Sequence, residues 1–297
     1  MDKETLSNYG WIVICVLVLA VMIALAGPFG TFVAGAVKST TTGLFGVNQN
    51  ALGAAGITID DQAFADGGNG GAGDQGGTNT LPEIGKTAEE YTWAEIKAIS
   101  EASKGDEYFI LGDTKTFTTS DGASVVMEIV AFNADTKADG TGTAGITWIS
   151  KDIFATHVMN SPDNNTGGWE VSEMRRWLKS DAYNTLPTEL KSAITTVNKT
   201  YYDKTTNSTL GCSDSVWIPS YREVFGTDDF ETSGTTYISY FTGSDSQVKK
   251  YTGSATAWWL RSAYKDNSIA FKNVHPYSDN SANHSDYPCG VVLGFCT

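Results

Sequence analysis

The longest apolar stretch of the chain lies near its N-terminus. Residues 5–37 carry no charged side chain, and Gly10–Gly27 are almost wholly apolar. At about 1.5 Å per residue, a helix over this stretch and its uncharged continuation can cross a hydrocarbon core about 30 Å thick. A cleaved signal peptide fits less well, because Met1–Glu4 have no net positive charge and the apolar run is too long. We therefore predict a single-pass transmembrane segment within residues 1–50, with the C-terminal part outside the cell because no second span follows.

A glycine-rich stretch follows this segment. Residues 61–80 contain seven glycines and few apolar side chains, so they cannot bury enough surface to order themselves. We predict a linker over residues 51–81, whose glycine-rich part would span about 20 Å as a flexible coil. No later break has a comparable composition, which indicates one folded domain over residues 82–297.

Within this domain the apolar positions follow both helical and strand periods. Helical spacing predicts helices over residues 92–100, 169–178 and 190–194. Runs of β-branched and aromatic residues between turn residues predict strands over 108–111, 123–132 and 146–149, and a short strand with a turn over 216–226. The mixture predicts an α+β fold with a small antiparallel sheet and long loops.

Two aromatic and apolar stretches, Trp258–Ser262 and Gly290–Thr297, frame a polar segment over residues 263–288. In this segment 16 of 26 residues are Asn, Tyr, Asp, Ser or His. Tyr gives broad contact area at low entropy cost and the small polar residues give adaptable hydrogen bonds, a mixture that is typical of binding surfaces. We expect the few apolar residues, Phe271, Val274 and Ala282, to anchor this surface to a core.

We predict that the polar segment binds a ligand, and its aromatic and polar residues are the candidate contacts. The alternative is a solvated loop, because Ser, Asn and Asp also stabilise turns through their own backbone hydrogen bonds. The candidate ligand-binding residues are Tyr264, Asp266, Asn267, Asn273, His275, Tyr277, Asp279, Asn280, Asn283, His284, Asp286 and Tyr287.

Charge and cysteine content narrow the functional classes. The formal net charge of −14 argues against nucleic acid as a partner, because phosphate binding requires clustered Lys and Arg. Four cysteines are too few for a disulfide framework. With Cys15 in the apolar run, we expect at most one disulfide among Cys212, Cys289 and Cys296.

Catalytic and metal-binding patterns are weak. No G-x-S-x-G elbow occurs, and His157 is predicted to be a structural histidine. The stretch that starts at Asp163 has the first spacings of a calcium-binding EF-hand loop, but its twelfth position is Met174. Asp279, Asn280 and Asp286 could hold a hard cation, although nothing fixes their geometry. We therefore expect no enzymatic activity and no cofactor.

The N-terminal segment resembles the first helix of short type IV pilins of the Flp/Tad kind. The resemblance rests on Tyr9-Gly10-Trp11-Ile12, the long aliphatic run, Pro28 and the small-residue continuation. Those pilins carry Glu before the Tyr, whereas Asn8 precedes Tyr9 here. The resemblance implies self-assembly into a filament through residues 6–45, while an ordinary membrane anchor is the alternative.

Four segments of the folded domain together resemble a second family. They are GWEVSEMRRWL (168–178), SVWIPSYREVFG (215–226), ATAWWLRS (255–262) and GVVLGFCT (290–297). In this order they are similar to bacterial extracellular domains with a C-type-lectin-like fold of the formylglycine-generating-enzyme type, and to the variable proteins of diversity-generating retroelements. The resemblance implies that residues 263–288 form a diversified ligand surface. This chain has Phe271-Lys272 where the family often has Phe-Cys, so a family disulfide to Cys296 is not carried over.

The sequence thus favours a surface-displayed adhesin or receptor at the cell membrane, whose domain binds a protein or glycan. Two alternatives remain. The domain could merely decorate a pilus built by the N-terminal helices, or it could be an enzyme on the same fold.

Overall fold

The structure is a computed structural model that describes residues 81–226 and 230–297. These residues belong to one unit, which runs from Gly77 to Thr297. The predicted transmembrane or pilin-like segment and nearly all of the predicted linker lie outside the described residues. Within the described residues, no helix has both the length and the apolar character needed to span a membrane.

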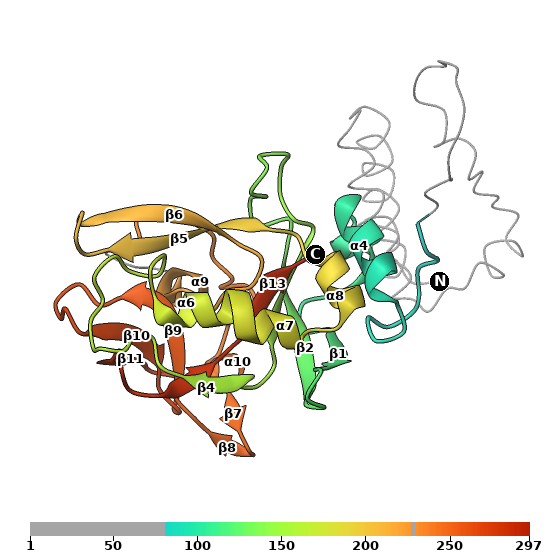
Figure 1. Cartoon of the computed structure of the whole chain (residues 1–297). Coiled ribbons are helices and arrows are strands. Elements are labelled where there is room, and N and C mark those ends of the chain that lie inside the picture. The colour runs from blue at the N-terminus through green and yellow to red at the C-terminus, as the bar shows by residue number, and fades with distance from the viewer. Residues whose placement is uncertain (1–80, 227–229) are drawn as a thin grey trace, which may run out of the picture. The chain divides into compact units, whose positions relative to one another are not determined.

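The first sheet lies near the start of the domain and includes the C-terminal strand (Figure 1). Its four strands pair antiparallel in the order β1-β2-β3-β13: β1 (Thr114–Thr118), β2 (Ser124–Phe132), β3 (Ile146–Ser150) and β13 (Gly294–Cys296). The helix α4 (Trp93–Glu101) packs against it, with the Trp93 ring edge-on to Trp148 and Phe295. α8 (Thr188–Ala193) lies beside α4, where Lys97 Nζ donates to the Ser192 carbonyl at 2.8 Å.

The second sheet carries most of the polar C-terminal segment. Its five strands follow the order β11-β10-β9-β12-β4: β11 (Asn280–His284), β10 (Ala270–Val274), β9 (Trp258–Ala263), β12 (Cys289–Val291) and β4 (Ala155–His157). All pairs are antiparallel except the contact between β9 and β12. The described residues also form two hairpins: β5 (Val197–Asp203) with β6 (Ser208–Asp214), and β7 (Lys250–Tyr251) with β8 (Ser254–Ala255).

The remaining helices are short. They are α5 (Gly105–Tyr108), α6 (Glu173–Trp177), the π-helical turn η2 (Leu178–Ala182), α7 (Tyr183–Thr185), α9 (Tyr221–Phe225) and α10 (Ser244–Gln247). This arrangement confirms the predicted α+β class with small antiparallel sheets.

Most predicted elements are confirmed, and the exceptions have local causes. The helix predicted over 169–178 begins only at Glu173, where the Ser172 hydroxyl caps it by accepting from Arg175 N. The strand predicted over 108–111 is wrong, because α5 and a turn occupy these residues. The strand and turn predicted over 216–226 are also wrong: the first part forms only an isolated bridge, between Trp217 and Gly294, and the second part is helical. Ser220 and Glu223 form a reciprocal capping box there, which starts α9.

A buried charged network joins the hairpin β5–β6 to β9. Lys199 Nζ donates to Asp135 Oδ1 at 2.5 Å, to Tyr237 Oη at 2.6 Å and to Glu223 Oε1 at 3.1 Å. Arg261 on β9 donates to both oxygens of Glu223, at 2.6 and 2.8 Å. All five side chains are fully buried. Because each charge has an opposite partner, the network can hold β9 firmly without an unpaired buried ion.

Candidate functional site

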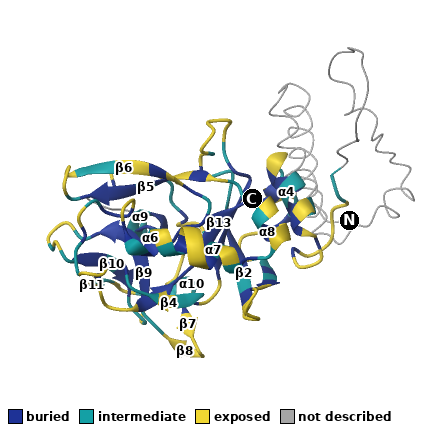
Figure 2. Cartoon of the chain, viewed as in Figure 1, coloured by how far each residue is buried: buried dark blue, intermediate teal, exposed yellow. Residues whose placement is uncertain are grey.

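The polar segment 263–288 forms one edge of the second sheet. From the end of β9 it crosses a loop, returns as β10, turns into β11 and reaches β12 through a second loop. Figure 2 shows β10 as largely buried, while β11 at the sheet edge is teal and yellow. The outer strand, the turn before it and the two loops therefore form the accessible part of the segment.

The stretches that flank the polar segment are buried. Trp258, Trp259 and Phe295 have no exposed surface. Of the three predicted anchors, Phe271 and Val274 are fully buried and Ala282 is half-buried. Gly290 and Gly294 permit close packing, because a β-carbon at either position would collide with Ile153 or Trp217, respectively.

The candidate ligand-binding residues fall into three classes of exposure. One candidate, Asn273, is buried and only 1% exposed. It therefore does not lie on the surface where the sequence predicted it. Tyr264, Asn267, His275 and Asn283 are half-buried. The exposed candidates are Asp266, Tyr277, Asp279, Asn280, His284, Asp286 and Tyr287.

Two tyrosines dominate the exposed surface. Tyr277 is 77% exposed and Tyr287 is 59% exposed, which is unusual for such large side chains. Tyr277 lies in the turn between β10 and β11, which is closed by a hydrogen bond from His275 N to Asp279 O at 2.7 Å. The His275 and Tyr277 rings lie 5.2 Å apart. The turn therefore presents an aromatic ring to solvent on an ordered backbone.

One side chain from a distant loop fixes the first loop of the segment. Asn165 is buried, and its Nδ2 donates to the carbonyls of Tyr264, Asn267 and Ala270, at 3.0, 2.7 and 2.8 Å respectively. Its backbone N–H donates to Ser268 O at 2.8 Å. Sequence analysis missed this role and saw Asn165 only as part of a failed EF-hand pattern. Its partners lie about a hundred residues away in the sequence, so no local signal marks them.

Asp163 fixes the second loop of the segment in a similar way. Its Oδ1 accepts from Ser285 N at 2.8 Å and from Ser285 Oγ at 2.7 Å, while His284 Nδ1 lies 3.1 Å from Oδ2. Asp163, His284 and Asp286 each place one potential ligand atom within 4.8 Å of the others. The candidate cation group suggested by the sequence contained Asp279, Asn280 and Asp286. In the structure, Asp286 instead groups with Asp163 and His284.

A small polar cluster lies beneath the exposed strand. Asn283 Nδ2 donates to Cys289 Sγ at 3.3 Å, and Asn273 Nδ2 lies 4.0 Å from the same sulfur. Burial raises the pKa of Cys289, although the two amides partly offset this effect. Cys212 and Cys296 are also buried free thiols, and burial followed by the nearby Asp214 raises the pKa of Cys212 to about 12. The part of the chain that the structure describes thus contains no disulfide, and its thiols are poor nucleophiles.

A pocket adjoins the first loop. It has a volume of about 430 Å³, and Lys265 from the segment lies on its wall, with Nζ 5.0 Å from the Phe230 ring. Tyr202 and Phe230 supply aromatic faces, with ring centroids 5.8 Å apart. The other lining residues are small and polar: Asn207, Ser208, Thr209, Thr232 and Ser233. Rings together with hydroxyl and amide groups suit a ligand with both apolar and polar faces.

Residues that could suggest catalysis have structural partners. The His157 ring stacks on Trp177 at 4.5 Å, and its Nδ1 lies 2.7 Å from Val158 O. Arg175 Nε donates to the buried Asp214 at 2.7 Å, as expected for a structural ion pair. Neither residue faces a described pocket.

Comparison with known proteins places part of this architecture in a family. Comparisons with curated proteins and with solved structures gave no match. Residues 144–293 match a family described as "Domain of unknown function (DUF6273)". This range begins just before β3 and ends just before β13, so it includes the second sheet, the polar segment and all of the charged network except Asp135. The chain belongs to this DUF6273 family.

Proposed function

We propose that this chain is a surface-displayed binding protein whose exposed edge, formed by residues 263–288, contacts a protein or a glycan. The observation that carries the proposal is the contrast within one hairpin. Phe271 and Val274 are fully buried, whereas Tyr277 in the turn that follows is 77% exposed. Large exposed aromatic rings do not stabilise a solvated loop. In binding interfaces, by contrast, such rings supply much of the binding free energy.

The supports of the hairpin strengthen the proposal. Asn165 and Asp163 fix the backbone of the two loops by hydrogen bonds, so their exposed side chains start from an ordered framework. A preorganised surface loses less conformational entropy when it binds. The finer identity that we propose for the fold, a C-type-lectin-like domain, rests on the four sequence segments described above.

The membrane and filament parts of the proposal rest on the sequence alone. We propose that residues 1–50 anchor the domain at the cell membrane, with the domain outside. If those residues instead assemble a pilus, the protein would appear in the filament fraction sheared from intact cells. Diversification of residues 263–288 would be supported by a reverse-transcriptase gene nearby and an imperfect copy of the final coding segment.

The binding test compares tyrosines inside and outside the surface. The full chain, its Tyr277→Ala/Tyr287→Ala variant and a Tyr251→Ala control are applied to the same arrays of glycans and cell-surface proteins. Tyr251 lies on β7 and is 38% exposed, so its removal controls for the loss of an accessible ring. We expect the binding signals of the double variant to be at least tenfold weaker than those of the wild type. A tenfold loss of affinity corresponds to about 1.4 kcal/mol of binding free energy, which is typical of residues that dominate an interface. Equal signals for all three proteins would refute the assignment of this surface.

A further inference from the structure

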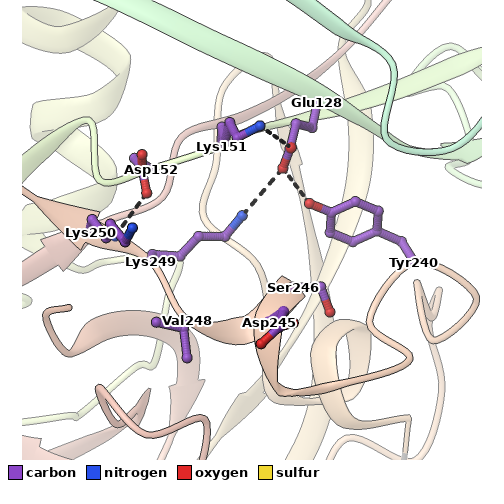
Figure 3. A pocket seen from close by; sticks show the side chains of 9 residues that line it. All are labelled: Glu128, Lys151, Asp152, Tyr240, Asp245, Ser246, Val248, Lys249 and Lys250. Carbon is purple, nitrogen blue, oxygen red and sulfur yellow. Dashed lines mark hydrogen bonds and ion pairs between the residues drawn. The ribbon is translucent and has the colours of Figure 1, made fainter. Parts of the chain in front are cut away.

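A second pocket, lined by residues outside the polar segment, contains a buried lysine. It has a volume of about 410 Å³ and lies among β2, the turn after β3 and the chain that runs from α10 into β7 (Figure 3). The side chain of Lys249 is only 2% exposed, yet it lines this pocket. A volume of this size can enclose a small organic molecule.

The ammonium group of Lys249 has only distant partners: besides one ion pair, its Nζ lies 5.8 Å from the centre of the Tyr240 ring. Its nearest ion-pair partner in the described structure is Glu128 Oε2, at 3.7 Å, which is too long for a good hydrogen bond. Glu128 is already engaged, because it accepts from the Tyr240 hydroxyl and pairs with Lys151 Nζ at 3.3 Å. Figure 3 shows all three groups converging on the Glu128 carboxylate. A buried ammonium without close acceptors is costly, and a structural lysine would be expected to have them.

We propose that Lys249 is a nucleophilic amine that captures small, polar, uncharged aldehydes as an imine in this pocket. The uncharged ligand follows from the charge balance of the lining. Glu128, Asp152 and Asp245 contribute three carboxylates, and Lys151, Lys249 and Lys250 contribute three ammonium groups, so neither an anion nor a cation is favoured overall. Polar groups on the aldehyde would meet the charged and hydroxyl groups of the lining.

The protonation state of Lys249 supports this role. Burial lowers the pKa of Lys249 to about 8, because the attraction of Glu128 and Asp152 only partly offsets the loss of hydration. Near pH 7.5, about a quarter of such a lysine is the neutral amine, against about a thousandth for an ordinary lysine. Perturbed lysines of this kind recur where an amine must attack a carbonyl.

The reaction balances without an outside oxidant or reductant. The lone pair of the neutral Nζ attacks the aldehyde carbon, and the carbonyl π electrons move to oxygen, which takes the first of the two protons of Nζ through solvent. Glu128 Oε2 lies 3.7 Å from Nζ, so a small side-chain movement lets it accept the second proton of the attacking nitrogen and return it to the leaving hydroxyl group. The carbon–oxygen bond then breaks, and the products are the imine and one water molecule. The step is reversible, because water can hydrolyse the imine.

The test is reductive trapping on the full chain. Glycolaldehyde and sodium cyanoborohydride are added from about pH 6.5 to about pH 9.5, and the modified lysines are quantified by peptide mass spectrometry. We expect Lys249 to be modified at least about tenfold faster than Nα-acetyl-lysine near pH 7.5, with a half-maximal rate near pH 8. Lys250 is the next residue and is exposed, so it serves as an internal comparison on the same peptide.

Two variants separate the pocket from general lysine chemistry. Lys86→Arg, at an exposed position outside this pocket, should leave the modification of Lys249 unchanged. Glu128→Gln removes the closest negative charge and should move the half-maximal rate of Lys249 to lower pH. Modification of wild-type Lys249 no faster than that of Lys250 at every pH would overturn the proposal and leave Lys249 as a structural lysine. This wild-type comparison decides the matter even if Glu128→Gln fails to fold.

Discussion

The strands β9 and β11 lie in the same sheet, on opposite sides of β10, yet they differ in almost every physical respect. All six residues of β9 are buried, whereas none of the five residues of β11 is. β9 contains two Trp and an Arg, while β11 contains only small and polar residues. The sheet thus has a rigid inner strand and an accessible outer strand.

The difference teaches that polar residues in this sheet have two distinct functions. Arg261 on β9 has fixed partners, because Nη1 also donates to Ile218 O and Nε to Thr200 O, each at 2.8 Å. The neighbouring Ser262 hydroxyl donates to Glu231 at 2.7 Å. The polar residues of β11 are exposed or half-buried, and Asn283 and His284 each have one protein partner, Cys289 and Asp163. Substitutions should therefore affect folding at β9 and binding at β11.

The largest effect should come from breaking the buried network at Arg261. Arg261→Met removes a buried positive charge and leaves the Glu223 carboxylate with Lys199 as its one ion-pair partner among the described residues. We expect the free energy of unfolding to fall by about 3–5 kcal/mol, as measured by urea denaturation. Arg176→Met on the exposed side of α6 is the matched control and should change it by less than about 0.5 kcal/mol. Similar effects of the two substitutions would mean that β9 is not held by this network.

Acid should weaken the same network. Burial by itself raises the pKa of Glu223, but Arg261 and Lys199 outweigh it and lower the pKa to about 2. The folded pKa is thus below the unfolded value of about 4.3, so this stabilisation is present above about pH 4.3 and is lost as pH falls towards 2. The loss should reach about 3 kcal/mol for this group, seen in urea denaturation at successive pH values. In Glu223→Gln this pH dependence should be weaker, and an unchanged profile would assign it to other carboxyl groups.

A substitution at Asn165 can test whether β9 and the polar segment 263–288 open independently. Asn165→Ala removes the amide that donates to the carbonyls of Tyr264, Asn267 and Ala270, with an expected loss of about 1–3 kcal/mol. Hydrogen exchange should become faster over residues 264–270, while the amides of β9 stay protected. Asn184→Ala, at an exposed position in α7, is a control that leaves this loop intact. Faster amide exchange in β9 as well would show that β9 and the polar segment open together.

The parts of the fold that could be predicted are those with local causes. The helix α4 was predicted correctly because Thr92 and Glu95 form a capping box before a clear apolar period. The same motif at Ser220 and Glu223 was read as a strand and a turn, because the apolar run Val216–Ile218 precedes it. Sequence gave no sign that Glu223 also pairs with Lys199 and Arg261, since such pairing depends on the tertiary fold.

The candidate surface shows the same limit. Composition correctly located an exposed polar segment with buried apolar anchors, since amino-acid type alone indicates where burial is favourable. It placed Asn273 on that surface, but strand alternation turns this side chain towards Cys289. The supports at Asp163 and Asn165 and the environment of Lys249 also depend on segments far apart in the sequence.

The smallest expected effect on stability, and the sharpest test of the two-strand comparison, comes from two aromatic residues of the β10–β11 hairpin. Tyr277→Ala removes a ring that is 77% exposed, so the free energy of unfolding should change by less than about 0.5 kcal/mol. Phe271→Ala, six residues earlier, empties a fully buried site and should cost about 3–5 kcal/mol. Both are measured by urea denaturation of the full chain. A large loss for Tyr277→Ala would mean that the ring packs against the protein and cannot serve as a free contact. A small loss for Phe271→Ala would instead mean that β10 does not anchor the outer strand β11. The distinction between a buried inner strand and a replaceable edge strand would then be wrong.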